Sequence, residues 1–323
     1  MQPARASDEG QLISRADFKS ALRDLSVGTL FDLSGQVAIL TGAAGGLGRW
    51  FAAGLAAAGS SLILTDRQDT DVTAMAETLR ACGAKVEALS ADLADAAAPR
   101  RITEFAQERM GRIDVLINNA GVNRRLPILD VDAPTLEWIW TINFRVPYLL
   151  ASQVARVMIE HGGGSIINIS SINAQAGVED VSLYGPTKAA LSQLTKVMAV
   201  EWARFGIRAN AIAPGFFATP MNSSHWVHPT RAPWIMDRIP LCRPGIPAEL
   251  VGTCILLASG ASSYLTGQTI CVDGGFTAGS RWNDPPGTGL DIFQTRGGFG
   301  LPRPTTPRTD GRPTTKLGAR QRT

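Results

Sequence analysis

Two residues that could carry out acid–base chemistry lie four positions apart in VSLYGPTKAALSQL, residues 181–194. Tyr184 and Lys188 would share one face at the start of a predicted helix, because residues four apart are neighbours on a helix surface. A free phenol has a pKa of about 10, too high for a base at neutral pH, and a nearby ammonium group lowers that pKa. With only three tyrosines in the chain, chance rarely produces such a pair. The spacing therefore predicts a proton-transfer site.

A second chemical signal is the glycine-rich stretch ILTGAAGGLGRW, residues 39–50. It follows a predicted strand and opens a predicted helix, where Gly42, Gly46 and Gly48 would let the backbone approach a pyrophosphate. The helix N-terminus offers N–H groups and a positive dipole end to the phosphates. No Lys-Ser/Thr pair follows the glycines, which excludes a P-loop. The stretch predicts a dinucleotide site.

Two charged residues at the end of the next predicted strand bear on the choice of dinucleotide. Asp66 can accept hydrogen bonds from the ribose hydroxyls and would repel a 2′-phosphate, whereas the adjacent Arg67 could accept that phosphate. Gly45 leaves the turn without a basic side chain that would assist Arg67. The sequence therefore favours NAD as the cofactor and keeps NADP as the alternative.

Alternating strands and helices must position these residues. The alternation predicts an α/β fold, a single-domain, doubly wound (Rossmann) parallel sheet of about seven strands with helices on both faces. Ligands bind at the carboxyl ends of the strands in such folds. Strands are predicted at 37–40, 61–66, 85–92, 114–121, 164–170, 208–215 and 268–275. Helices are predicted at 49–59, 72–83, 99–111, 136–160 and from residue 184 onward.

Composition divides the chain into three parts. Residues 1–33 form a polar leader with an amphipathic stretch at 17–25, residues 34–279 hold the Rossmann domain, and residues 280–323 are rich in proline and glycine. The last part has too few apolar residues to offset the entropy of ordering, so we predict a disordered basic tail. It carries a net charge of +5 and the rest of the chain −2, so a nucleic-acid partner is not expected, with DNA binding by the tail as the alternative.

Other classes of protein are disfavoured. No apolar run reaches 18 residues, so we expect no membrane partner. His225 and His228 have an H-x-x-H spacing without a carboxylate or thiol beside them, so we expect no metal site. The first residues lack the apolar core of a signal peptide, which predicts a cytoplasmic protein with reduced thiols. Four cysteines could form two disulfides, but they contain no C-x-x-C pair: Cys82, Cys242, Cys254 and Cys271.

Several motifs together resemble the short-chain dehydrogenase/reductase family over about residues 33–279: TGAAGGLG, NNAG at 118–121, PG at 214–215, Asn143 and the Ser171/Tyr184/Lys188 spacing. Finer strings, such as FDLSG and GGGSIINISS, look like the branch of gluconate 5-dehydrogenases and related sugar-acid or polyol dehydrogenases. They are also similar to 3-oxoacyl-carrier-protein reductases, which stay as the alternative.

The resemblance implies an NAD(P)-dependent oxidoreductase that interconverts a secondary alcohol and a ketone on a small polar substrate. It also implies a homotetramer built through two long helices that begin near Leu136 and Tyr184. A function of another class, a non-catalytic dinucleotide-binding sensor or scaffold, would keep the fold. Such a protein has no need of an acid–base pair, so the retained Tyr184 and Lys188 favour an enzyme.

The resemblance implies a catalytic tetrad. Tyr184 would be the general acid/base and Ser171 the hydroxyl that holds the substrate oxygen. Lys188 would bind the nicotinamide ribose, and Asn143 would position a water that leads to Lys188. One departure from the family pattern is Pro186, where small residues are more usual. Proline is tolerated in a first helical turn, because its missing N–H has no helical partner there.

Cofactor contacts are implied along the carboxyl edge of the sheet. Asp92 would lie near the adenine amine, Asn119 and Gly121 would line the cleft, and Thr219 would touch the carboxamide or a phosphate. The full implied set is Gly42, Gly46, Leu47, Gly48, Asp66, Arg67, Asp92, Leu93, Asn119, Gly121, Tyr184, Lys188, Pro214, Gly215 and Thr219.

The substrate side of the site is predicted from a less regular segment. Residues 216–245 are interpreted as an ordered lid that excludes water on closure. Substrate contacts are predicted for Ser171, Tyr184 and Arg125. Arg125 could hold a substrate carboxylate in a bidentate pair, or it could be an ordinary surface arginine.

Overall fold

The computed structural model describes residues 26–279 of the 323-residue chain. The amphipathic stretch predicted at 17–25 and the predicted tail at 280–323 lie outside the described residues.

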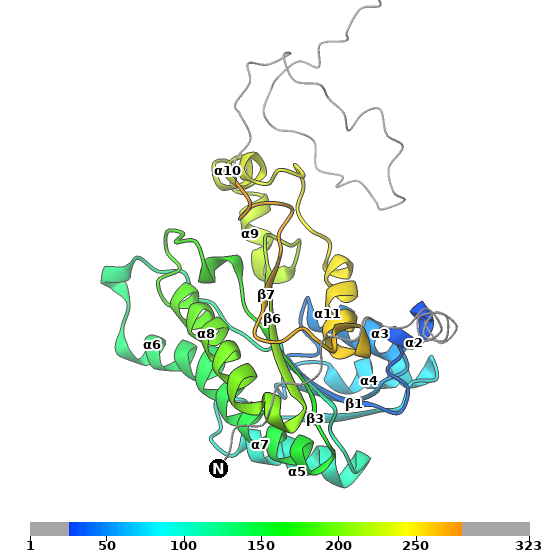
Figure 1. Ribbon diagram of the computed structural model, residues 1–323. Coiled ribbons are helices and arrows are strands. Elements are labelled where there is room, and N and C mark those ends of the chain that lie inside the picture. Colours follow the sequence, from blue (N-terminus) through cyan, green and yellow to red (C-terminus); the bar gives the residue numbers. More distant parts are fainter. Residues whose placement is uncertain (1–25, 280–323) are drawn as a thin grey trace, which may run out of the picture.

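Seven parallel strands form one sheet in the order β3-β2-β1-β4-β5-β6-β7 (Figure 1). The chain winds outward from β1 in one direction and then from β4 in the other, which confirms the predicted doubly wound fold. Ile39 at the centre of β1 lies opposite Ile63 of β2 and Leu116 of β4. The strands are β1 (Val37–Thr41), β2 (Ser61–Asp66), β3 (Val86–Ser90), β4 (Val115–Asn118), β5 (Gly164–Ile169), β6 (Ile207–Pro214) and β7 (Thr269–Val272).

Strand β1 shows why the sheet is covered on both sides. All five of its residues are buried. Ala38 and Leu40 pack into one hydrophobic cluster, and Val37 and Ile39 pack into another. Successive side chains of a strand point to opposite faces, so a strand that is buried on both faces reads as an unbroken apolar run.

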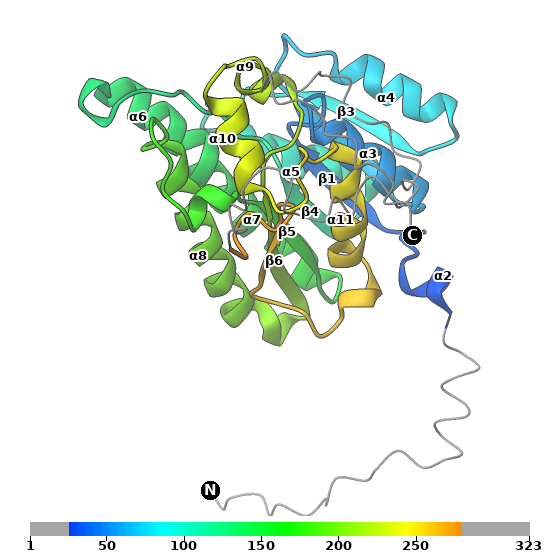
Figure 2. The ribbon, with the colours of Figure 1, turned by 90° about the horizontal axis from the view of Figure 1, so that it is seen from above.

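Helices cover the two faces of the sheet in two layers (Figures 1 and 2). The first layer supplies Phe51, Ala76 and Leu257 to one cluster and consists of α3 (Gly48–Ala57), α4 (Val72–Ala81) and α11 (Val251–Ala258). The second supplies Ile102 and Leu150 to the other cluster and consists of α5 (Ala98–Met110), α7 (Val146–Glu160) and α8 (Tyr184–Trp202). The other α-helices among the described residues are α2 (Val27–Leu30), α6 (Ala133–Trp140), α9 (Ser223–Trp226) and α10 (Arg231–Arg238).

The helix predicted at 136–160 is divided in the structure. It consists of α6, a π-helical segment over Thr141–Arg145, and α7. Pro147 lies just after the segment, and a proline cannot donate to the carbonyl of the residue four positions earlier, here Asn143. A π segment widens the turn at this point, as such segments often do near functional residues.

The predicted lid contains two helices that the sequence did not indicate. Helices α9 and α10 lie beyond the ends of β6 and β7, and viewed from above they lie between α6 and α3 (Figures 1 and 2). Trp234 of α10 and Phe216 both contact the ring of Phe276, with ring centroids 6.4 and 5.3 Å apart. These contacts join the lid to the segment after β7 and place it over the carboxyl end of the sheet. Within residues 26–279, no helix is both long and apolar enough to cross a membrane.

Candidate active site

The catalytic residues predicted from the sequence come together where β5 ends and α8 begins. Ser171 follows β5 and caps the short helix η3 (Ile172–Ala174), with its hydroxyl oxygen accepting from the Asn173 N–H at 3.1 Å. Tyr184 is the first residue of α8, and Lys188 follows one turn later. Residues far apart in the sequence thus meet at the carboxyl edge of the sheet, where doubly wound folds bind ligands.

The adjacent serines 170 and 171 have different surroundings. The Ser170 hydroxyl donates to the Lys188 carbonyl oxygen at 3.0 Å and lies 2.7 Å from the hydroxyl oxygen of Ser192. Ser170 therefore fastens α8 to the end of β5. The Ser171 side chain instead hydrogen-bonds with the Tyr184 phenol. Ser171 is the serine that can share a substrate oxygen with Tyr184.

Lys188 is almost completely buried, with 2% of its surface exposed. Its Nζ donates to the Ile169 carbonyl oxygen at 2.7 Å and lies 5.6 Å from the centre of the Tyr184 ring. Burial lowers the pKa of Lys188 to about 8. A Cβ atom at Gly121 would lie 3.2 Å from Nζ, so the glycine leaves room for this amine.

The pKa of the Tyr184 phenol is governed by opposing effects. Burial raises it, whereas the hydrogen bond with Ser171 and the positive charge of Arg125 lower it. The spacing predicted that the charge of Lys188 lowers this pKa, whereas in this structure the lowering charge is that of Arg125. The reason is that the Lys188 amine donates to the Ile169 carbonyl oxygen, and burial lowers the pKa of this amine and so disfavours its charged form.

Asn143 lies in the π segment and is fully buried. Its Oδ1 accepts from the Val122 N–H at 2.8 Å, and its Nδ2 donates to the Val122 carbonyl oxygen at 2.9 Å and the Thr187 hydroxyl oxygen at 3.2 Å. The side chain therefore fixes the segment after β4 against the first turn of α8. Its role in positioning a water stays a prediction.

The glycine-rich turn fits a close backbone approach. Gly42 has a φ of +64°, and a Cβ there would lie 2.8 Å from the Ala120 Cα. A Cβ at Gly48 would lie 2.8 Å from the Ala43 carbonyl oxygen. The Asn119 Nδ2 donates to the Thr41 and Gly42 carbonyl oxygens at 3.0 and 2.9 Å. Asn119 thus fixes the shape of the turn. A side chain at Gly42 or Gly48 would collide with the neighbouring backbone.

Asp66 lies beside this turn at the end of β2. Its Oδ2 accepts from the Ala44 N–H at 2.9 Å, so the carboxylate is held against the glycine-rich turn. Arg67 is paired with Asp69 at 3.1 Å, and both side chains are exposed. An exposed pair of this kind contributes little free energy and can be released.

The remaining predicted cofactor residues lie on two sides of the turn. Thr219, at the base of the lid, lies against the turn, because a Cβ at Gly46 would be 3.1 Å from the Thr219 Cβ. Pro214 ends β6, and Gly215 follows it where a Cβ would be 2.7 Å from the Asp273 Cα. Asp92 is exposed after β3, and two further predicted residues pack inward, Leu47 and Leu93.

Arg125 is partly buried beside the catalytic residues, which argues against an ordinary surface arginine. Within the described residues its side chain makes no hydrogen bond and no ion pair. Three residues near Arg125 were not predicted from the sequence to lie at this site: Asp180, His225 and Arg231. The charges of Asp180 and Arg231 act on the pKa of Arg125, and the charge of Arg125 lowers the pKa of His225. His225 was considered only as a metal ligand, and no motif marks Asp180 or Arg231.

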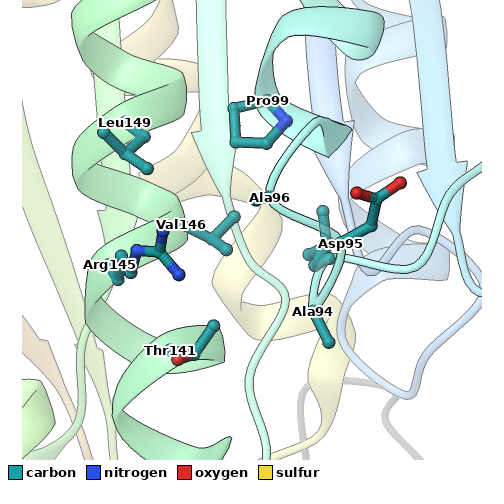
Figure 3. A pocket seen from close by; sticks show the side chains of 9 residues that line it. Ala94, Asp95, Ala96, Pro99, Thr141, Arg145, Val146 and Leu149 are labelled. Atoms are coloured by element: carbon teal, nitrogen blue, oxygen red, sulfur yellow. The ribbon is translucent and has the colours of Figure 1, made fainter.

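Away from the catalytic residues, the described part of the chain contains two small cavities. The cavity in Figure 3 measures about 10 Å³, room for about one water. Of the predicted site residues only Leu93 lines it, together with Ala94, Asp95, Ala96, Pro99, Thr141, Arg145, Val146 and Leu149. A second cavity of about 100 Å³ lies under the lid beside β7, between Phe217 and Val272.

Comparisons with known proteins agree with this geometry. The family model described as Enoyl-(Acyl carrier protein) reductase matches residues 42–277. The chain is 37% identical over 249 residues to 2-dehydro-3-deoxy-D-gluconate 5-dehydrogenase of Dickeya dadantii (strain 3937), covering 77% of this chain and 98% of that protein. It is 39% identical over 247 residues to L-xylulose reductase of Bos taurus, covering 76% of this chain and 98% of that protein.

A solved structure is similar over the same region. It is a gluconate 5-dehydrogenase from Burkholderia cenocepacia J2315 in complex with NADP and tartrate, with a TM-score of 0.76 and 36% identity. The match covers 79% of this chain and 100% of that chain. The chain belongs to the short-chain dehydrogenase/reductase family, as the motifs predicted. It is an oxidoreductase that interconverts an alcohol and a ketone with NAD or NADP.

Proposed function

We propose that the substrate is a sugar acid, with a polyol of similar size as a poorer substrate. The observation that carries this proposal is the guanidinium of Arg125, partly buried and close enough to Tyr184 for its charge to lower the phenol's pKa. A cation without an ion-pair partner of its own among the described residues, near Tyr184, suits a substrate carboxylate. The similarity to sugar-acid dehydrogenases supports the same class.

The proposed catalytic roles are supported by where the side chains lie. Ser171 and Tyr184 share the substrate oxygen, and Tyr184 as phenolate accepts the hydroxyl proton. The nicotinamide, when bound, would supply the acceptor for the hydride of the carbinol carbon, so that the alcohol would lose two electrons and become a ketone. Lys188 would hold the nicotinamide ribose, and the proton would later leave Tyr184 toward solvent. In the reverse direction neutral Tyr184 donates the proton.

The turn at residues 42–48 would hold the pyrophosphate, and Asp66 would hold the ribose. We favour NAD, because the Asp66 carboxylate adjoins the turn while Arg67 is turned to Asp69. NADP would require Arg67 to leave that pair and shield a 2′-phosphate from Asp66. The ratio of kcat/KM for the two cofactors tests this preference.

Three further features are proposed for the whole protein. The oxidoreductase domain spans residues 34–279 and assembles as a homotetramer. The exposed apolar residues of the α6–α7–α8 face support that assembly: Leu136, Trp138, Trp140, Tyr148, Val197 and Val200. The location is cytoplasmic, which suits thiols that form no disulfide among the described residues.

The direct test is a substrate panel followed by absorbance at 340 nm. Sugar acids, matched polyols and β-ketoacyl thioesters are assayed with NAD(H) and NADP(H). We expect the highest kcat/KM with a sugar acid and NAD. A preference for β-ketoacyl thioesters with NADPH would instead support the ketoreductase alternative.

A further inference from the structure

The lid and the body of the domain meet at an ion pair near the catalytic residues. Arg231 is the first residue of α10, and its Nη2 lies 3.4 Å from Oδ2 of Asp180. The Asp180 carbonyl oxygen accepts from the Leu126 N–H at 3.2 Å, which joins this residue to the segment that carries Arg125. Asp180 itself has a φ of +63°, a left-handed conformation that costs free energy in a residue other than glycine. The three segments are held together at the entrance to the site.

His225 of α9 lies in the same place. Only 2% of its surface is exposed, and its Nδ1 is buried without a hydrogen-bond partner among the described residues. Burial and the charges of Arg125, Arg231 and His228 lower the pKa of His225 to about 4. The imidazole is therefore neutral at neutral pH, so it can donate one hydrogen bond and accept another.

Three of the six other buried polar side-chain atoms without partners among the described residues come from the same three segments. They are Oδ1 of Asn123, just before Arg125, the hydroxyl of Ser182, just after Asp180, and Nε1 of Trp226, beside His225. A buried polar atom without a partner destabilises the fold, because it has lost its hydrogen bonds to water. Four such atoms in neighbouring segments indicate that a polar molecule completes the site.

The charges at this place do not balance. The positive charge of Arg231 lowers the pKa of Arg125, and Asp180, which pairs with Arg231, is the carboxylate that raises it. Two cations with one carboxylate leave an excess of one positive charge in a partly buried region. A single carboxylate balances this excess, whereas a dianionic phosphate would reverse its sign.

We propose that Arg231 and His225 are specificity residues of the lid, which bind the substrate's carboxylate and an adjacent hydroxyl group. This inference rests on the proposed function and deepens it. Arg231 donates to the carboxylate together with Arg125, and the His225 imidazole pairs with the hydroxyl. An acidic substrate thereby joins the lid to the body, and a neutral polyol lacks the group that Arg231 binds.

The test compares Arg231→Gln with Arg238→Gln. Arg238 is the last residue of the same helix and stacks on Trp234, with its guanidinium carbon 4.1 Å from the ring centre, so it controls for loss of one charge in α10. The substrates are D-gluconate and its uncharged counterpart D-sorbitol, at saturating cofactor. We expect Arg231→Gln to raise KM for gluconate by about 10- to 100-fold, the loss of a charged hydrogen bond. We expect KM for sorbitol to change by less than about threefold.

Variants of His225 give a second signature. His225→Ala removes the proposed hydroxyl contact and should raise KM for both substrates, whereas His225→Gln keeps a donor and an acceptor and should restore much of the loss.

Arg238→Gln should leave both KM values unchanged. Equal changes in KM for gluconate and sorbitol in Arg231→Gln, or changes no larger than those in Arg238→Gln, would overturn the proposal.

A binding measurement separates this inference from the proposed function. D-Gluconate, which carries a single carboxylate, is titrated calorimetrically into the parent and into Arg231→Gln, each saturated with NADH so that no oxidation occurs. Binding by the parent that weakens at least about tenfold in Arg231→Gln supports the carboxylate site, even if the enzyme oxidises no sugar acid and the proposed substrate is wrong. Gluconate binding that is absent in the parent, or equal in both proteins, overturns the site.

Discussion

At the scale of single residues, burial shifts both members of the catalytic pair toward their neutral forms. It raises the pKa of Tyr184 and lowers that of Lys188. Ser171 and Arg125 counteract the effect on the phenol. A base at Tyr184 therefore depends on two groups, each from a different segment.

The depressed pKa of Lys188 predicts a pH dependence of stability. The pKa is about 8 in the folded protein and 10.5 for the free side chain. Below pH 8 the amine is charged in both states, and burying the charge destabilises the fold. Between pH 8 and 10.5 the folded state loses this proton first, so the penalty disappears. We expect the free energy of unfolding of the cofactor-free parent to rise relative to Lys188→Met across this window, by about 3 kcal/mol at most.

Urea unfolding of both proteins at several pH values measures the difference. Lys196→Met, an exposed substitution on the same helix, is the control and should track the parent. A pH-independent difference between the parent and Lys188→Met would show that Lys188 titrates normally in the fold.

Arg125 gives a prediction for both binding and proton transfer. Arg125→Leu should raise KM for a sugar acid at least about tenfold and leave KM for a polyol little changed. It should also move the apparent pKa of alcohol oxidation upward, because the charge that favours the phenolate is gone. Arg124→Leu is the matched control, since Arg124 is exposed and bonds to the Thr135 hydroxyl oxygen at 3.1 Å. Initial rates from pH 6 to 10 measure both effects, and equal losses with acid and polyol would refute the carboxylate role.

At the scale of elements, the glycine-rich turn depends on backbone proximity. Gly48→Ala would place a Cβ 2.8 Å from the Ala43 carbonyl oxygen, and the turn must open to accept it. We expect cofactor affinity to fall more than about tenfold and the free energy of unfolding to fall by about 1–3 kcal/mol.

Gly252→Ala in α11 is the matched control. A Cβ there meets no atom within 4 Å, and alanine is the better helix former by about 1 kcal/mol. Fluorescence titration with NADH and urea unfolding give the two readouts. Unchanged NADH affinity in Gly48→Ala would mean that the pyrophosphate is not held against this turn.

Elements with a local sequence signal were predicted well. The strand ending at Asp66 has the predicted bounds, because its apolar run is limited by turn residues on both sides. Helix α11 was not predicted, since VGTCILLA is apolar on every side and has no helical period. The π segment at 141–145 depends on Pro147 and on tertiary bonds of Asn143, and hydrophobic periodicity reports neither.

The site was predictable to the extent that its residues belong to motifs. The stretches around Gly42, Ser171 and Tyr184 predicted a tight glycine turn and a group of side chains that the structure brings together at the end of β5. The charge near Tyr184 was assigned to Lys188, because spacing along a helix does not show where an amine is directed. Asp180, His225 and Arg231 were missed as site residues, since only the folded lid brings them to the entrance of the site.

At the scale of the whole molecule, the apolar face of α6, α7 and α8 predicts assembly. Val200 of α8 is 82% exposed, and a tetramer would bury it or its neighbours. Val200→Arg should shift the protein to smaller species, because a charge in such an interface is costly to desolvate. Val227→Arg, at an equally exposed valine in the lid, should leave the mass unchanged. Light scattering after size exclusion measures the mass, and a parent that is monomeric would contradict the proposed assembly.

The account depends most on the phenol of Tyr184 as the group that exchanges the substrate's proton. Tyr184→Phe keeps the ring in place and removes only the oxygen. The decisive measurement is single-turnover hydride transfer in parent and variant, with cofactor affinity determined on the same samples. We predict a rate lower by about 10²- to 10⁴-fold with unchanged NAD(H) affinity. A Phe variant that transfers hydride as fast as the parent would contradict the account.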